Sequence, residues 1–394
     1  MRKGMLCALL AALCLTGCAA PAQSAQSGQP ESSAQPALST LAPAQPTPEP
    51  EPQPPTLQEQ AQAILDDMTR EETVGQLFFV RYPGQTDLAV QWAEDYNLGG
   101  YILFGRDFKE DTPDGVRAKI AACQAASTTP LLVGVDEEGG TVVRASYYPA
   151  FREQKFQSPQ KVYAAGGLEA IGADATEKST FLKELGINVN LAPVCDVSTD
   201  PDDFIYDRSF GQDAQATAEY VSVVVSAMAE QSMGSVLKHF PGYGNNVDTH
   251  TGIALDERPL EHFLEYDLLP FQAGVEAGAV AVLVSHNIVT CLDAELPASL
   301  SPAAYALLRE EVGFDGVAMT DDLDMDAVKA YVEDGSATVQ AISAGADMVL
   351  TSDPEGQIRQ LLTALEEGRL DWKRIQEAAE RVLCWKLELG LISS

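Results

Sequence analysis

The stretch Met233–His250 reads M-G-S-V-L-K-H-F-P-G-Y-G-N-N-V-D-T-H. Its opening run is mostly apolar, which predicts a buried strand, and Lys238 and His239 follow directly. The proline and glycines after them predict a shaped loop, which ends in Asp248 and His250. The chain has four histidines, and two of them lie in this stretch. Scarce charged groups just past a buried strand favour an active-site loop, although they could also only satisfy backbone groups at a strand end.

The same arrangement of an apolar run, polar residues and a helical stretch recurs from residue 57 to the end of the chain. The predicted strands are Leu77–Val80, Tyr101–Phe104, Leu131–Val135, Asn188–Ala192, Ser235–Leu237, Val280–Val284, Gly316–Met319 and Asp347–Leu350. The predicted helices are Leu57–Met68, Asp87–Tyr96, Pro113–Ser127, Leu168–Leu185, Ala214–Gln231, Leu260–Gly278, Pro302–Glu311 and Met325–Ala344, with two more at the end of the chain. This alternation predicts an α/β fold.

The strands are continuous apolar runs, which is typical of a parallel sheet that is buried on both faces. The length from Leu57 to Ser394 suits a (β/α)8 TIM-like barrel that forms a single catalytic domain. A doubly wound open sheet is the alternative, but the sequence has no G-x-G-x-x-G dinucleotide loop and no Walker loop. We therefore predict the barrel.

Polar side chains follow several of the predicted strands, and the carboxyl ends of all strands in such a barrel share one face. These residues are Asp136, Asp196, Lys238, His239, Ser285, His286 and Asp321. Carboxylates, imidazoles and cations on one face suit nucleophilic or acid–base chemistry on a polar substrate. This face is therefore the predicted site.

The composition is that of an ordinary globular protein, with 45% apolar and 21% charged residues among 394. A full-sized hydrophobic core is therefore possible. The formal net charge is −33. A surface this acidic repels phosphate, so we expect no nucleic acid partner. We expect a monomer with a solvated acidic surface.

The first 56 residues are predicted to lie outside the fold. Residues 1–18 combine a positive start, an apolar run too short to span a bilayer, and Leu-Thr-Gly before Cys18. This pattern resembles the lipobox of bacterial lipoproteins, in which the cysteine is lipidated. Residues 19–56 are rich in Pro, Gln and Ser and predict a disordered tether before the domain at 57–394. We expect an extracytoplasmic protein, lipid-anchored to the bacterial cell membrane.

The cysteines after the predicted lipidation site are widely spaced and lie among apolar residues. They are Cys123, Cys195, Cys291 and Cys384. Their spacing matches neither a zinc motif nor a dense disulfide framework, so free, buried thiols are expected. A metal site built from His239, His250 and His286 with Asp136 and Asp321 is an alternative, but no H-x-H pair occurs at a strand end. We expect no metal and no cofactor.

Five motifs in this chain resemble those of β-N-acetylglucosaminidases in glycoside hydrolase family 3, in the order that the family has them. They are V-D-E-E-G-G-T-V-V-R at 135–144, D-R-S-F-G at 207–211, K-H-F-P-G-Y-G with D-T-H at 238–250, L-P-A-S-L-S at 296–301 and G-V-A-M-T-D-D-L-D-M at 316–325. The resemblance covers nearly all of the chain from residue 57. Tyr243 and Thr141 stand where many relatives have His and Arg.

The resemblance implies a retaining double displacement on a glycoside. Asp321 would be the nucleophile, although a carboxylate there could also stabilise the start of a helix. His250 would be the general acid and base, held by Asp248. An imidazole suits this role because it titrates near neutral pH, and a neighbouring carboxylate fixes its tautomer and stabilises its cation.

The resemblance also implies a set of residues that bind the hydroxyls of the sugar. They are Asp136, Arg144, Arg208, Lys238 and His239. Aspartate is an acceptor for hydroxyls, and arginine and lysine are donors. For the two arginines, a structural ion pair at the mouth of the barrel is the alternative.

The implied function is that of an exo-acting β-N-acetylglucosaminidase, which removes terminal N-acetylglucosamine from muropeptides or related glycans. A β-glucosidase and a phosphorylase of the same family are alternatives. A neutral histidine would not repel phosphate as a carboxylate would. A non-catalytic sugar-binding lipoprotein is a third alternative, although binding alone needs no nucleophile opposite an acid/base pair.

Overall fold

The computed structural model describes residues 54–246, 254–325, 328, 331–332 and 336–392. These residues contain a closed barrel of eight parallel strands, in the order β1-β10-β9-β7-β5-β4-β3-β2. Its strands are β1 (Phe78–Arg81), β2 (Gly100–Leu103), β3 (Leu132–Val135), β4 (Val189–Asn190), β5 (Gly234–Phe240), β7 (Ala281–Val284), β9 (Val317–Asp322) and β10 (Met348–Thr351). A separate pair, β6 (Leu255–Asp256) and β8 (Ile288–Val289), lies outside the barrel.

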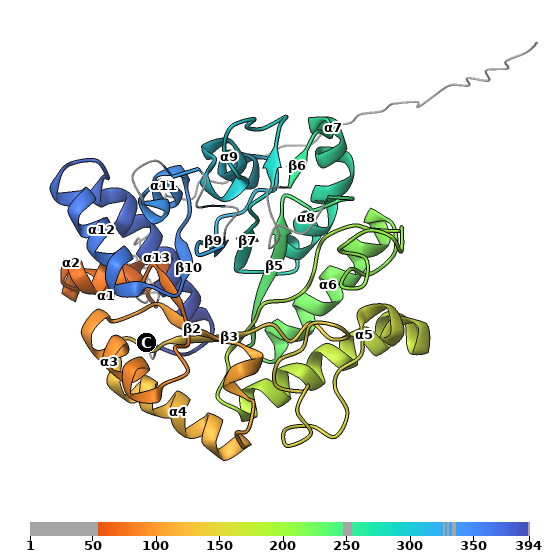
Figure 1. The fold of residues 1–394 in the computed structure, drawn as a ribbon, viewed down its shortest axis with the longest axis horizontal. Coiled ribbons are helices and arrows are strands. Elements are labelled where there is room, and N and C mark those ends of the chain that lie inside the picture. Colours follow the sequence, from red (N-terminus) through yellow and green to blue (C-terminus); the bar gives the residue numbers. More distant parts are fainter. Residues whose placement is uncertain (1–53, 247–253, 326–327, 329–330, 333–335, 393–394) are drawn as a thin grey trace, which may run out of the picture. The chain divides into compact units, whose positions relative to one another are not determined.

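Helices connect the strands and surround the barrel (Figure 1). They are α1 (Leu57–Asp67), α2 (Arg70–Gly75), α3 (Thr86–Tyr96), α4 (Pro113–Ala126), α5 (Pro159–Glu184), α6 (Ala214–Glu230), α7 (Leu260–His262), α8 (Leu268–Glu276), α9 (Pro302–Glu310), α11 (Ala337–Ala344), α12 (Pro354–Glu366) and α13 (Trp372–Glu388). Short segments of tighter or wider helix are η1 (Gly105–Asp107), η2 (Phe263–Asp267) and η3 (Ala298–Leu300). Side chains at the first residues fix several helix starts, as in the reciprocal capping of α1 by Thr56 and Glu59.

The predicted barrel and all eight predicted strands are confirmed. One helix prediction is wrong, because Met325–Ala344 is not a single helix. Val332 is not helical, and α11 begins only at Ala337. The backbone of Ser336, with φ −113° and ψ 62°, lies outside the helical region and interrupts the segment. The Asp-Gly-Ser sequence just before α11 indicates a turn, but the prediction gave more weight to the periodic apolar pattern.

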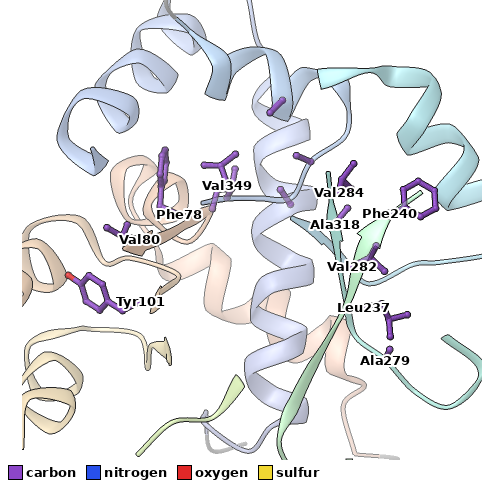
Figure 2. Close-up of a cluster of buried hydrophobic side chains, with 14 of the residues drawn as sticks. Phe78, Val80, Tyr101, Leu237, Phe240, Ala279, Val282, Val284, Ala318 and Val349 are labelled. Carbon is purple, nitrogen blue, oxygen red and sulfur yellow. The ribbon is translucent and has the colours of Figure 1, made fainter. Parts of the chain in front are cut away.

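The hydrophobic core has two layers because neighbouring side chains on each strand point to opposite faces. Phe79, Leu283 and Met319 belong to the cluster inside the barrel. Phe78 and Val282 belong to the larger cluster between the strands and the helices. Figure 2 shows part of this outer layer, with side chains from several strands directed away from the barrel interior. Burial on both faces explains the continuous apolar runs in the sequence.

Helix α13 closes the end of the barrel at which the strands begin. Trp385 belongs to the inner cluster, and a Cβ atom on Gly234, the first residue of β5, would lie 3.1 Å from its ring. The next residue, Lys386, is buried and donates from Nζ to Gln76 Oε1 at 2.6 Å. Because this end is filled, a ligand can enter the barrel only from the opposite end, where the strands finish.

The four cysteines of the domain are free, but only two are buried as predicted. Cys123 and Cys195 are buried, Cys384 is half-buried and Cys291 is exposed, so the prediction of burial is wrong for the last two. Cys291 lies two residues beyond β8, in a turn where apolar neighbours do not guarantee burial. Within the described ranges, no helix is both long and apolar enough to cross a membrane.

Candidate active site

A pocket of about 450 Å³ opens at the end of the barrel where the strands finish. Its floor is apolar and is formed by three residues of the strands β2, β7 and β10 and by one residue directly after β4. They are Ile102, Leu191, Leu283 and Leu350. Its walls carry charged side chains, among them Asp136, Arg144, Arg208, Lys238, His239 and Asp321. The pocket therefore has the volume and the mixed lining of a small-molecule site.

Lys238, near the end of β5, is the central cation of this pocket. Its Nζ donates to Asp136 Oδ1 at 2.7 Å and lies 2.7 Å from Glu138 Oε1, with only 2% of the side chain exposed. Glu138 also accepts from Arg208, at 3.0 Å from Nε and 2.8 Å from Nη2. Arg144 Nη2 lies 3.3 Å from Asp136 Oδ2. Three cations thus bracket two carboxylates in one connected network.

The two carboxylates of this network are held in their charged form. Burial acts to raise the pKa of Asp136, but Lys238 and Arg144 outweigh it and lower that pKa. Burial also opposes the charge of Glu138, and Arg208 and Lys238 together hold the pKa of Glu138 well below its usual range. Asp136 therefore remains an acceptor at neutral pH, and it lines the pocket where a sugar hydroxyl could donate to it.

The hydrogen bonds of His239 fix its tautomer. An arginine can only donate, so Nε2 accepts from Arg208 Nη2 at 3.1 Å. The hydrogen therefore sits on Nδ1, which donates to Asp196 Oδ2 at 2.7 Å. Asp196 also accepts from the backbone N–H groups of His239 and Tyr243. His239 lines the pocket, and through its two ring nitrogens it also links Arg208 to Asp196.

The buried side chain of Glu137 holds the loop after β3 in place. Its carboxylate is fully buried and accepts from the backbone N–H groups of Arg144, at 3.0 Å, and Ala145, at 2.9 Å, and from the Ser146 hydroxyl. Its own backbone N–H donates to Asn190 Oδ1 on β4 at 2.9 Å. The three acidic residues at 136–138 thus serve three purposes, since Asp136 lines the pocket, Glu137 holds the loop and Glu138 binds the cations.

Asp321 is next to last in β9 and lines the pocket. Its Oδ1 accepts from the backbone N–H of Asp322 at 2.8 Å. The Asp322 side chain pairs with Arg81 Nη1 at 3.1 Å. Behind it, His286 Nε2 donates to the Asp322 carbonyl at 3.0 Å, and its Nδ1 lies 2.7 Å from Ser299 Oγ. His286 does not line the pocket, and it supports the end of β9 from behind Asp322.

Asp322 brings an ionisation near neutral pH to the pocket. Burial raises the pKa of this carboxyl to about 6, against the hydrogen bond from the backbone of Asp324 and the attraction of Arg81. The proton is therefore bound more tightly in the folded than in the unfolded chain. The stability that this proton contributes is complete below about pH 4 and is lost as the pH rises through about 6.

Replacing Asp322 with asparagine should remove this pH dependence. The variant is expected to gain stability relative to the wild type as the pH rises, by about 2 kcal/mol between about pH 4.5 and 7.5. Urea unfolding at both pH values measures the difference, with Glu94→Gln on the exposed side of α3 as the control. A difference that is the same at both pH values would contradict the assignment.

The predicted site residues fall into two groups. Six of them, the pocket-lining set above, come together on one face. Asp248, His250 and Cys18 lie outside the described residues. Glu137, Glu138 and Arg81 were missed by the sequence reasoning, although two of them stand in the quoted D-E-E-G-G motif. Among the described residues, no group of three or more His, Cys, Asp or Glu side chains is placed to hold a metal ion.

Comparison with known proteins identifies the class to which this fold and pocket belong. The family model of the glycosyl hydrolase family 3 N terminal domain matches residues 69–384. The chain therefore belongs to glycosyl hydrolase family 3 and is a glycoside hydrolase. A protein of Xanthomonas campestris pv. campestris (strain B100) named beta-hexosaminidase is 34% identical over 282 residues, which cover 68% of this chain and 82% of that protein.

Solved structures show the same fold. A glycoside hydrolase family 3 beta-N-acetylglucosaminidase from Paenibacillus sp. str. FPU-7 matches with a TM-score of 0.76 and 30% identity, over 83% of this chain and 64% of that one. The structure of M tuberculosis LpqI matches with a TM-score of 0.75 and 30% identity, over 82% of this chain and 95% of that one. The family resemblance seen in the motifs is thus confirmed.

Proposed function

We propose that the chain is a retaining exo-β-N-acetylglucosaminidase, which removes terminal β-linked N-acetylglucosamine. The observation that carries this proposal is the placement of Asp321 in one pocket with the Asp136–Lys238 pair and Arg144. A nucleophilic carboxylate then faces groups that can bind several hydroxyls at once. The names of the Xanthomonas relative and of the Paenibacillus structure support the choice of the N-acetylated sugar.

In this mechanism the Asp321 carboxylate attacks the anomeric carbon while the bond from that carbon to the aglycone oxygen breaks. The leaving oxygen takes a proton from His250, and a covalent glycosyl ester forms. A water molecule then gives a proton back to His250 and attacks the same carbon, which releases Asp321. Two inversions give net retention. Asp248 would orient the imidazole and stabilise its cation.

The geometry supports different contributions from the proposed sugar-binding residues. Asp136, Arg144 and Lys238 line the pocket directly and can accept from or donate to hydroxyls. Arg208 also lines the pocket, yet it spends two donors on Glu138 and one on His239. Arg208 can therefore serve both as a structural ion-pair partner and as a sugar-binding residue. Glu138 and His239 fix the orientation of its guanidinium, and its remaining N–H donors stay available for a sugar hydroxyl.

A direct assay tests the proposal. The purified protein is given a chromogenic β-N-acetylglucosaminide and the matching β-glucoside, each with and without phosphate and with and without chelator. Preferred release from the N-acetylated substrate, with a β-configured sugar as first product by NMR, supports the proposal. Preference for the glucoside would indicate a β-glucosidase instead. Acceleration by phosphate, with a sugar phosphate as product, would indicate a phosphorylase, and loss of activity in chelator would indicate a metal-dependent enzyme. No turnover by the folded protein would favour a sugar-binding lipoprotein.

The proposed acid/base has its own test. His250→Ala is expected to slow hydrolysis of a substrate with a poor leaving group by about 10²–10⁴-fold. An activated aryl leaving group needs little protonation, so it should still form the glycosyl-enzyme. Added azide, which attacks without a general base, should then speed turnover and give a β-glycosyl azide. Equal losses for both leaving groups, with no azide product, would rule out this role for His250.

We further propose that the enzyme acts outside the cytoplasm as a lipid-anchored monomer on muropeptides or related glycans. The lipobox-like sequence before Cys18 and the Pro-rich segment after it support this location. Labelled palmitate should be incorporated into the wild-type chain expressed in a bacterium and not into Cys18→Ala. Labelling of both chains, or recovery of the wild type in the cytoplasm, would contradict the anchor. Release of N-acetylglucosamine from purified muropeptides tests the substrate.

A further inference from the structure

A second hollow of about 300 Å³ adjoins the active-site pocket. Phe104 and Gly105 follow β2 and form one side of it. The other side comes from the loop after β3, with Val143, Arg144, Tyr147 and Tyr148. Phe104 and Arg144 line both hollows. The second hollow therefore borders the pocket in which the glycosidic bond would be cleaved.

Tyr147 is an unusual surface residue. It is 62% exposed, which is more than any other large hydrophobic side chain among the described residues. Its ring contacts the edge of Tyr148, with ring centroids 5.2 Å apart at 81°. An aromatic ring that faces solvent beside a binding pocket is typical of a recognition surface.

The buried Glu137 fixes the position of this ring relative to the pocket. Its carboxylate holds the backbone of Arg144 and Ala145 and the Ser146 hydroxyl, so three consecutive residues are fixed directly before Tyr147. The backbone of Tyr148 donates to the Ala145 carbonyl at 3.2 Å. The same buried group thus directs Arg144 toward the catalytic pocket and Tyr147 toward the adjoining hollow.

We propose that this hollow is an aglycone subsite, which binds the second pyranose ring of a β-linked disaccharide against Tyr147. The inference rests on the proposed function, since it assigns the part of the substrate beyond the cleaved bond. A pyranose has an apolar face of C–H groups and a rim of hydroxyls. The aromatic ring of Tyr147 suits the face, and the Arg144 guanidinium and the tyrosine hydroxyls suit the rim.

The subsite predicts a substrate-dependent effect of Tyr147→Ala. For N,N′-diacetylchitobiose, whose aglycone is a sugar ring, kcat/KM should fall about fivefold to tenfold, as expected for loss of one aromatic contact. For the β-glycosyl fluoride of N-acetylglucosamine, whose leaving group is a single atom, kcat/KM should stay within about twofold. Tyr147→Phe keeps the ring and should retain most of the activity toward the disaccharide.

The matched control is Tyr163→Ala on α5. Tyr163 is also exposed and also packs edge-on against an aromatic ring, but it lines neither hollow. It should affect neither substrate. Three results would overturn the subsite. Tyr147→Ala could change both substrates equally, it could leave the disaccharide unchanged, or the wild type could cleave the fluoride but not the disaccharide. A wild type that cleaves neither would show that the proposed function itself is wrong, and the subsite with it.

Discussion

Replacing Asp321 with asparagine is expected to reduce glycoside hydrolysis by roughly 10⁴-fold or more and to leave the fold intact. The amide has the shape of the carboxylate but cannot form the glycosyl ester. Its oxygen can still accept the hydrogen bond that Asp321 Oδ1 now receives from the backbone of Asp322. Turnover of a chromogenic β-N-acetylglucosaminide and the urea-unfolding midpoint measure the two parts of this prediction.

Asp324→Asn is the matched control for Asp321→Asn. Asp324 lies three residues further along the same segment and also lines the pocket, but its carboxylate accepts from Ser352. We expect its replacement to change the rate by no more than about tenfold. A slow fluorinated substrate should add one sugar mass to the peptide that contains Asp321 in the wild type. A trapped sugar on Asp322 or Asp324 would move the nucleophile to that residue.

Most of the fold could be predicted because its signals are local. A strand that is buried on both faces is a continuous apolar run, and eight such runs alternate with amphipathic segments. The prediction for the segment before α11 was wrong because the periodicity of apolar residues does not show a break in the middle of a helical pattern. At Ser336 the backbone leaves the helical region, and only the turn-forming residues just before it indicate this.

The site could be predicted only in part, because the direction of a side chain after a strand depends on the backbone. Asp136, Glu137 and Glu138 are neighbouring acids, and the sequence selects only the first. The turn after β3 sends Glu137 under the loop and Glu138 toward Lys238 and Arg208. The link that His239 makes between Arg208 and Asp196 is likewise invisible in the sequence, which predicts only a binding role for this residue.

Lys238→Met should destabilise the fold by about 3–5 kcal/mol at neutral pH, in addition to weakening sugar binding. Methionine fills a similar volume, but Asp136 and Glu138 then keep only one arginine each. Lys238 is the first of the charges that lower the pKa of Asp136, so this pKa should rise in the variant. In the wild type, the stability from Asp136 is present above its unfolded-state pKa of about 4 and is lost only below it. In the variant, protonation of Asp136 at its raised pKa removes the uncompensated charge, so the destabilisation should shrink as the pH falls.

Lys386 is also buried, and it separates this electrostatic effect from the loss of a long side chain. Burial lowers the pKa of Lys386 to about 7, and within the described part of the chain no carboxylate offsets this effect; the hydrogen bond to Gln76 is neutral. A lowered lysine pKa means that the wild type loses stability as the pH falls from about 10 to 7. Lys386→Met removes the cost of burying this amine but leaves the Gln76 oxygen unpaired, which costs about 1–3 kcal/mol. The net effect at pH 7 should be neutral or stabilising.

The two variants should therefore differ at pH 7, although both replace a buried lysine by a thioether: Lys238→Met lowers the free energy of unfolding, and Lys386→Met leaves it unchanged or raises it. Urea unfolding of each variant at several pH values measures this contrast. If both are destabilised alike and without pH dependence, lost packing explains the effect, and the network around Lys238 is not primarily electrostatic. If only Lys238→Met is destabilised, and less so in acid, the pairing with Asp136 and Glu138 is what keeps this cation in the pocket.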